Sequence, residues 1–329
     1  MHATLACDPD TGTCLVPDPS AAPHGDRLLC DPASPSHAQP HHAPPVVTLH
    51  LFTDPICSAC WVMEPALRRL LADTRGRLQM THHTGGLLRS WAHFTAGPIQ
   101  GPEDVAHHWE AMGAHFGMPL TGAVWRTDPL DSSDRPSVAV HAAEAQGAGE
   151  RFLRRLREQL FLEGRNIARA DVLHEAARQA GLDADHLLAQ VEDPHSEAWA
   201  HFEDDLRLAR TMRVTGFPTF AFRAGSAMRA FTGVRQWHEL AAVVDALASG
   251  ATGHAPGTTP GAPTPAAGRE PAAASVNALL AHHDSWTAPE AAVFLDLPRD
   301  TATRLLDDAV GTGRLVRHDT RAGTLWRRR

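Results

Sequence analysis

Two cysteines separated by two residues give this sequence its clearest chemical signal. Cys57 and Cys60 stand in the stretch FTDPICSACWVMEP, residues 52–65, directly after a short apolar run. Two thiols at this spacing can exchange electrons as a dithiol and a disulfide, hold a metal ion as thiolates, or lie together by chance. The choice depends on the elements that position the two sulfurs.

The apolar run before the cysteines predicts that they begin a helix. VVTLHLF, residues 46–52, indicates a buried strand, and a helix is expected from about 57 to 72. At a helix start, unpaired backbone N–H groups and the helix dipole favour a thiolate at the first cysteine. This geometry predicts an exposed nucleophile at Cys57 and a buried resolving thiol at Cys60, which attacks a mixed disulfide formed on Cys57.

Two prolines add weight to the redox interpretation. Pro65 lies inside the expected helix, where a proline removes a hydrogen bond and kinks the helix. Pro218 opens a strand in VTGFPTF, residues 214–220, where a cis X–Pro bond would turn the preceding backbone toward the dithiol. The alternative for Pro218 is an ordinary turn proline at the edge of a sheet.

The order of the remaining elements places both motifs in one α/β unit. The predicted segments are a second strand at 77–83, helices through most of 87–212, strands at 218–222 and 228–233, and a closing helix at 235–247. The expected order is therefore strand–helix–strand, a helical block, and strand–strand–helix.

The two ends of the chain differ from this unit. Residues 1–45 are rich in Pro, Asp, His and Cys without periodicity, which predicts a disordered tail. Residues 249–274 are rich in Gly, Pro, Ala and Thr and indicate a flexible linker. Residues 275–329 contain three short helices and a two-stranded ribbon, a pattern similar to a winged helix.

The motifs resemble those of thioredoxin-fold proteins, and more narrowly those of the DsbA-like proteins, which carry a helical insertion in a thioredoxin core. DPICSACWVMEPALRRL, GGLLRSW and LARTMRVTGFPTF are similar to the SpxH (YjbH) family of DsbA-like ClpXP adaptors, and the similarity covers residues 46–248. It implies a thioredoxin-like core with the insertion at about 87–212 and a small C-terminal winged-helix-like domain, residues 275–329. The dipeptide Ser58-Ala59 departs from the bulkier or proline-containing pairs expected there.

The resemblance also implies roles for residues near the dithiol. In thioredoxin-fold proteins the backbone before the cis proline receives the substrate as an extra strand. Phe217, Pro218 and Thr219 are therefore expected beside a client. Trp61 is a further candidate for contact with the client, and packing over the helix is the alternative for its side chain.

Two functions from different classes stay open. In the first, the protein is a thiol–disulfide oxidoreductase or isomerase that uses Cys57 and Cys60. In the second, it is a non-catalytic adaptor of the SpxH type, which binds a transcription regulator for the ClpXP protease and whose thiols act only as a redox sensor. The fold and the motif serve both uses.

Composition narrows the partners. The net charge of −8 argues against a protein that mainly grips nucleic acid or an anionic membrane. The first residues lack both a basic start and an apolar segment, so we expect a cytoplasmic protein whose partners are proteins. No phosphate-binding loop and no serine-hydrolase motif occurs in the sequence.

The tail cysteines form a separate group. Cys7, Cys14 and Cys30 stand among five histidines and could supply a zinc site. The spacing of Cys7 and Cys14 is unusual for zinc, and a disulfide between them under oxidising conditions is the alternative. No other cofactor is expected. The histidine doublets, such as His82-His83, are expected on solvated faces.

Overall fold

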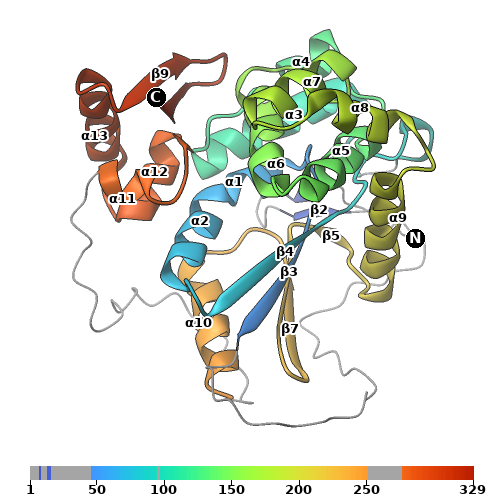
Figure 1. Cartoon of the computed structure of the whole chain (residues 1–329), viewed down its shortest axis with the longest axis horizontal. Coiled ribbons are helices and arrows are strands. Elements are labelled where there is room, and N and C mark those ends of the chain that lie inside the picture. Colours follow the sequence, from blue (N-terminus) through green and yellow to red (C-terminus); the bar gives the residue numbers. More distant parts are fainter. Residues whose placement is uncertain (1–6, 9–12, 16–45, 95–96, 251–275) are drawn as a thin grey trace.

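The computed structural model describes residues 7–8, 13–15, 46–94, 97–250 and 276–329 (Figure 1). Its centre is a four-stranded sheet of order β4–β3–β6–β7. The strands are β3 (Val47–Thr53), β4 (Leu78–Thr84), β6 (Thr219–Ala224) and β7 (Ala227–Thr232). β3 runs parallel to β4 and antiparallel to β6, and β7 is antiparallel to β6.

Alternation along β3 explains one face of this sheet. Val47, Leu49 and Leu51 are buried and belong to one apolar cluster, as expected for side chains at every second position of a strand. Two helices supply the rest of that cluster: α2 (Glu64–Asp73) and α10 (Trp237–Ala248). Both helices lie against this side of the sheet in Figure 1.

The helix that follows β3 is broken, as the position of the proline predicts. α1 (Ser58–Val62) ends at Met63, and α2 begins directly afterwards with Pro65 in its first turn. A proline is tolerated in a first turn because its missing N–H would have no partner there. The break therefore gives the cysteine-bearing turn a direction of its own.

A helical block lies between β4 and β6, as the sequence predicts. Its elements are η1 (Trp91–His93), α3 (Pro102–Phe116), α4 (Ala123–Thr127), α5 (Asp134–Ala145), α6 (Gly149–Arg157), the π-helical turn η2 (Glu158–Leu162), α7 (Ala170–Gln179), α8 (Ala184–Glu192) and α9 (Glu197–Thr211). The core of this block also contains the Cys57–Val62 turn, so the site lies between the sheet and the insertion.

The C-terminal residues form a compact module. Its elements are α11 (Val276–Leu280), β8 (Ser285–Trp286), α12 (Ala288–Leu295), α13 (Arg299–Gly311), β9 (Leu315–Asp319) and β10 (Thr324–Arg328). The three strands pair in the order β8–β10–β9, so the predicted two-stranded ribbon gains a third strand of two residues. Thr287 and Glu290 form a capping box at the start of α12.

Buried charges join this module to the insertion. The two terminal nitrogens of Arg154, Nη1 and Nη2, donate to the carboxylate of Glu290 at 2.6 and 3.0 Å. Nε of Arg154 donates to Glu158 at 2.8 Å. Glu158 in turn accepts hydrogen bonds from Ser285 and, at 2.9 Å, from Arg327. The carboxylates of Glu158 and Glu290 are fully buried, so these contacts are shielded from solvent.

The same network reaches the start of α2. Glu64 accepts a hydrogen bond from Arg157 at 2.7 Å. Burial alone would raise the pKa of Glu64, but three neighbouring guanidinium groups, led by that of Arg157, outweigh it and hold the pKa below its ordinary value. The contact between the insertion, α2 and the module is therefore built from ionised groups.

Two short strands near the N-terminus differ from the predicted disordered tail. β1 (Cys7–Asp8) pairs with β2 (Thr13–Leu15), and β2 pairs with β5 (Gly216–Phe217), all antiparallel. The reason is that a strand edge offers backbone N–H and C=O groups to a further strand. The other residues of 1–45, and residues 251–274 of the predicted linker, lie outside the described residues. Within the described part of the chain, no helix is long and apolar enough to cross a bilayer.

Candidate functional site

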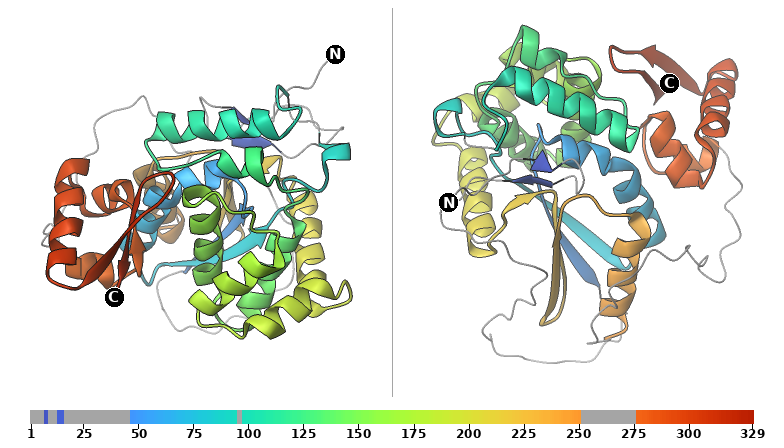
Figure 2. Two further views of the ribbon diagram at one scale, coloured as in Figure 1. Left: turned by 90° about the horizontal axis from the view of Figure 1, so that it is seen from above. Right: turned by 180° about the vertical axis from the view of Figure 1, so that it is seen from behind.

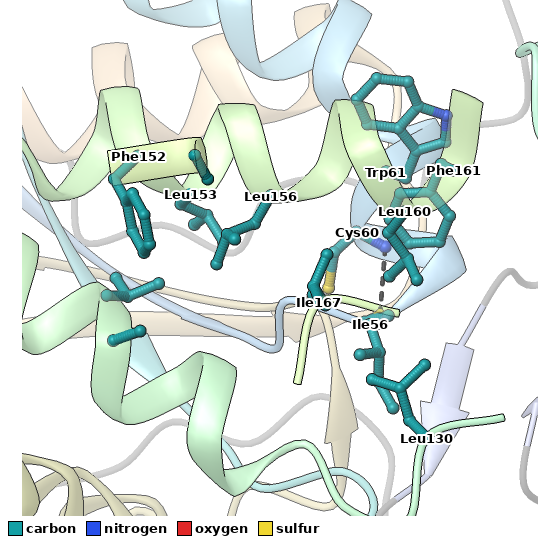
Figure 3. Close-up of a cluster of buried hydrophobic side chains, with 14 of the residues drawn as sticks. Ile56, Cys60, Trp61, Leu130, Phe152, Leu153, Leu156, Leu160, Phe161 and Ile167 are labelled. Carbon is teal, nitrogen blue, oxygen red and sulfur yellow. Dashed lines mark hydrogen bonds between the residues drawn. The ribbon is translucent and has the colours of Figure 1, made fainter. Parts of the chain in front are cut away.

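The turn between β3 and α1 places the two sulfurs close together. Cys57 is the N-cap residue of α1, and its Sγ accepts a hydrogen bond from the backbone N–H of Cys60 at 3.1 Å (dashed line in Figure 3). The backbone N–H of Cys57 donates to the carbonyl of Asp54 at 3.1 Å. Cys60 carries a free thiol, so no disulfide joins it to Cys57. An N–H donor at the sulfur of Cys57 stabilises negative charge there.

The burial of the two sulfurs differs from the sequence prediction. Cys57 is 0% exposed and Cys60 is 5% exposed, whereas an exposed Cys57 ahead of a buried Cys60 was expected. The reason lies in the surrounding core, because the insertion and the N-terminal strand β2 both contact α1. Access to Cys57 therefore requires that part of this cover moves.

Asp54 is a residue of the site that the sequence analysis missed. Its carboxylate accepts hydrogen bonds from the backbone N–H groups of Ile56 at 3.0 Å and Leu87 at 2.6 Å, and from the hydroxyl of Ser133 at 2.9 Å. It thereby ties the cysteine turn to two segments of the insertion. The available signal was its place in the sequence, directly before Pro55 and three residues ahead of Cys57.

The carboxyl group of Asp54 also titrates at an unusual pH. Burial raises the pKa of Asp54 to about 6, although its hydrogen-bond donors act in the opposite direction. A carboxyl group with a pKa near neutrality can hold or release a proton under physiological conditions. Asp54 is therefore a candidate proton acceptor as well as a residue that positions the turn.

The loop around Pro218 lies beside the end of β3. The Phe217–Pro218 peptide bond is cis. Thr219 pairs in register with Phe52, and the Pro218 carbonyl accepts a hydrogen bond from Gly233 at 2.8 Å. The ring of Phe217 packs where a Cβ on Gly85 would stand, so a side chain at that glycine would clash with it. The structure thus brings the two motifs predicted from sequence to the same end of the sheet.

The predicted client-contacting side chains are largely buried. Phe217 is 1% exposed and Thr219 is 5% exposed, with the Thr219 hydroxyl donating to the carbonyl of Gly216 at 2.7 Å. The burial of both side chains differs from the expectation that they contact a client directly.

Trp61 packs within the insertion. It is 0% exposed, its indole N–H donates to the Pro119 carbonyl at 2.9 Å, and its ring stacks on Phe161. Figure 3 shows these two rings beside Cys60. The guanidinium carbon of Arg154 lies 4.7 Å from the centroid of the Trp61 ring. This geometry favours the packing alternative over direct contact with a client.

An apolar recess adjoins the cysteine turn. Its lining is formed by Ile56, Ser58, Leu87, Leu88, Trp91, Phe94, Ile99, Val105, His108, Trp109 and Trp125. Three buried polar atoms of this lining have no hydrogen-bond partner: Ser58 Oγ, His108 Nε2 and Trp125 Nε1. Buried polar atoms are usually paired, so the recess offers hydrogen bonds to an incoming group.

A second titratable cluster lies beneath β4. Asp205 binds His83 at 2.6 Å and His141 at 3.1 Å, and it accepts a hydrogen bond from the Thr84 backbone at 2.7 Å. His83 is buried, so the prediction of a solvated His82-His83 doublet is wrong for His83, because α9 covers this part of β4. The cluster joins β4 to the insertion. Among the described residues, no group of three His, Cys, Asp or Glu side chains could hold a metal.

Comparison with known proteins agrees with this architecture. The thioredoxin family model Thioredoxin_5 matches residues 50–242. The ClpXP adapter protein SpxH of Halalkalibacterium halodurans is 36% identical over 203 residues, which cover 60% of this chain and 65% of the relative. SpxH of Shouchella clausii is 32% identical over 225 residues, which cover 67% of each chain. The chain thus spans about two thirds of the length of these curated relatives.

Solved structures show the same fold. A candidate protein disulfide isomerase of Nitrosomonas europaea is 16% identical, with a TM-score of 0.53 over 62% of this chain and 98% of the other. A candidate DsbA oxidoreductase of Streptomyces coelicolor is 21% identical, with a TM-score of 0.50 over 65% of this chain and 92% of the other. The order of elements, the cysteine turn and these matches agree: the chain belongs to the thioredoxin family and is similar to the SpxH proteins.

Proposed function

We propose that the protein exchanges disulfides with a protein client through Cys57 and Cys60. The observation that carries this proposal is the hydrogen bond from the Cys60 backbone N–H to Cys57 Sγ at the start of α1. It supports a thiolate at Cys57, and a thiolate is the form that attacks a disulfide. Pro218, at the same end of the sheet, supports the same function.

The proposed reaction moves two electrons. The Cys57 thiolate attacks a client disulfide, forms a mixed disulfide and releases one client thiolate. The Cys60 thiolate then attacks Cys57 Sγ, forms the Cys57–Cys60 disulfide and releases the second client thiolate. The client is reduced and the protein oxidised; the reverse sequence oxidises a client.

Activity on a protein with scrambled disulfides tests this function. The Cys57→Ala/Cys60→Ala variant should lose the ability to refold such a protein. The Cys60→Ser variant should trap mixed disulfides with clients, whereas Cys57→Ser should trap few. Cys30→Ser is the matched control and should behave as the wild type. Full refolding activity of the double-alanine variant would contradict the proposal.

A second function, that of a protease adaptor, is favoured by the relatives. Two of them, both named ClpXP adapter proteins, are 36% and 32% identical in sequence to this chain over the aligned residues. As an adaptor, the protein would bind a client regulator in the cytoplasm and present it to ClpXP, with the thiols as a redox sensor. A pull-down with the double-alanine variant separates the two functions: recovery of the same clients together with a protease subunit supports the adaptor.

We also propose that residues 276–329 form a winged-helix-like module and that this module contacts proteins. Their order of helix, strand, two helices and two strands supports this. The exposed side of α13 carries Asp300, Asp307 and Asp308, which oppose contact with DNA phosphates.

A further inference from the structure

The N-terminal strand β2 lies on the backbone edge beside Pro218. Cys14 is the register partner of Phe217, and Leu15 is the register partner of Gly216. β2 also contacts α1, the helix that carries Cys60. Figure 1 shows β2 beside β5, and Figure 2 shows the same region from two further sides. A segment of this chain therefore occupies the edge next to the dithiol.

This edge is the place where a client strand would pair. Backbone pairing with an exposed strand edge binds an extended peptide without requiring particular side chains. Since β2 pairs with both residues of β5, a client strand and β2 cannot use that edge together. The N-terminal segment thus holds the position of a client, an inference that rests on the proposed function.

The backbone register also pairs two cysteines. Cys7 and Cys14 are partners in the antiparallel pair of β1 and β2. Directly opposed residues in such pairs have Cα atoms about 4.5 to 5.5 Å apart. Disulfides span Cα separations of about 4.4 to 6.8 Å. The backbone register therefore places the two cysteines at a Cα separation that a disulfide can span.

We infer that Cys7 and Cys14 form a second redox centre. It occupies the β5 edge, where a client strand would pair, and it reacts with Cys57 and Cys60 by thiol–disulfide exchange. Cys14 is the entry point, because its backbone is opposite Phe217 and next to the site. The segment acts as a resident client: it fills the edge while no external client is bound.

The exchange balances within the chain. Starting from the Cys57–Cys60 disulfide, the Cys14 thiolate attacks Cys57 Sγ, forms a Cys14–Cys57 disulfide and releases the Cys60 thiolate. The Cys7 thiolate then attacks Cys14, forms the Cys7–Cys14 disulfide and releases the Cys57 thiolate. Two electrons pass from the tail pair to Cys57 and Cys60, and no outside reductant takes part. The starting disulfide is supplied by a disulfide client.

Trapping the intermediate tests this inference. The full-length Cys7→Ser/Cys60→Ser variant lacks both resolving thiols, so a Cys14–Cys57 disulfide should persist. The reduced variant is treated with one equivalent of an aromatic disulfide reagent, quenched with acid, and mapped by mass spectrometry without reduction. The Cys14–Cys57 peptide pair should exceed the Cys30–Cys57 pair by about tenfold, since the paired strand raises the effective concentration of Cys14.

Two controls separate the possible failures. In Cys14→Ser/Cys60→Ser, the tail should form little disulfide with Cys57. In a variant that lacks residues 1–15, Cys57 should react faster with the reagent than in the full chain. Equal amounts of the Cys14 and Cys30 pairs would overturn the inference while leaving the proposed function intact. A Cys57 that does not react in the shortened variant would overturn the proposed function itself.

Discussion

The two ends of the chain both contact the thioredoxin-like core, and they do so by different interactions. The C-terminal module is joined to the core by buried charges, with Arg154 and Glu290 at the centre. The N-terminal strands are joined to it by a backbone ladder between β2 and β5. One contact depends on particular side chains, and the other depends on an open strand edge.

From this difference we expect the C-terminal contact to persist and the N-terminal contact to open more readily. Removing one partner of a buried ion pair leaves an uncompensated charge, so the module is expected to stay in place. A backbone hydrogen bond contributes only about 0.5–1.5 kcal/mol net, because water replaces it when the strand leaves. The N-terminal contact is therefore exchangeable, as a contact at the position of a client must be.

The largest expected effect is at the C-terminal contact. Arg154→Ala removes the guanidinium that bridges Glu290 and Glu158, and leaves Glu290 with Arg68 alone, at 3.4 Å. The free energy of unfolding should therefore fall by about 3 kcal/mol, the lower end of the range for breaking a buried ion pair. Arg126→Ala is the matched control. Arg126 pairs with Glu103 and Glu110, but its side chain is 33% exposed, so its loss should leave the free energy of unfolding almost unchanged. Urea denaturation measures the free energy of unfolding of both variants. Similar losses of stability in the two variants would contradict the prediction.

The next effect is a pH dependence of stability that arises from Asp54, beside the cysteine turn. The pKa of Asp54 is about 6 in the folded protein and 3.8 ordinarily, so its protonated form is favoured by folding. Its stabilising contribution is full below the ordinary pKa and is lost as the pH rises through 6. The stability difference between the wild type and Asp54→Asn should change by about 2 kcal/mol between about pH 7.5 and about pH 4.5. Urea denaturation across this range measures it; a flat difference would contradict the pKa.

A smaller effect is expected at the N-terminal contact. Deletion of residues 1–15 should change the free energy of unfolding by less than about 1 kcal/mol, because only short backbone ladders are lost. The rate at which iodoacetamide labels Cys57 should nevertheless rise. A large loss of stability with no change in labelling would mean that the strand is a structural part of the core.

The smallest expected signal is binding of DNA by the full chain. Arg304 pairs with Asp300 at 3.1 Å, and Arg317 contacts Asp307 at 3.5 Å, so cations near α13 already have acidic partners. Fluorescence anisotropy with duplex DNA should show no tight, salt-sensitive binding. Such binding would shift the role of the C-terminal module from protein contact to DNA.

The sequence alone predicted the main elements of the core. Its strand patterns agree with β3, β4, β6 and β7, and Pro65 marked the break between α1 and α2. These features are local, because they depend on alternation along a strand and on the missing N–H of proline. The spacing of Cys57 and Cys60 is also a local feature, so the sequence alone predicted that the two residues lie close together.

Only the tertiary structure decided how the site is covered and tuned. The burial of Cys57, the three donors to Asp54 and the pairing of Cys14 with Phe217 join residues far apart in the chain. Spacing carries no information about such contacts, since burial and pKa depend on everything packed around a group. A strand of two or three residues is likewise too short for a pattern, so β1, β2 and β5 form only where the N-terminal segment meets the backbone before Pro218.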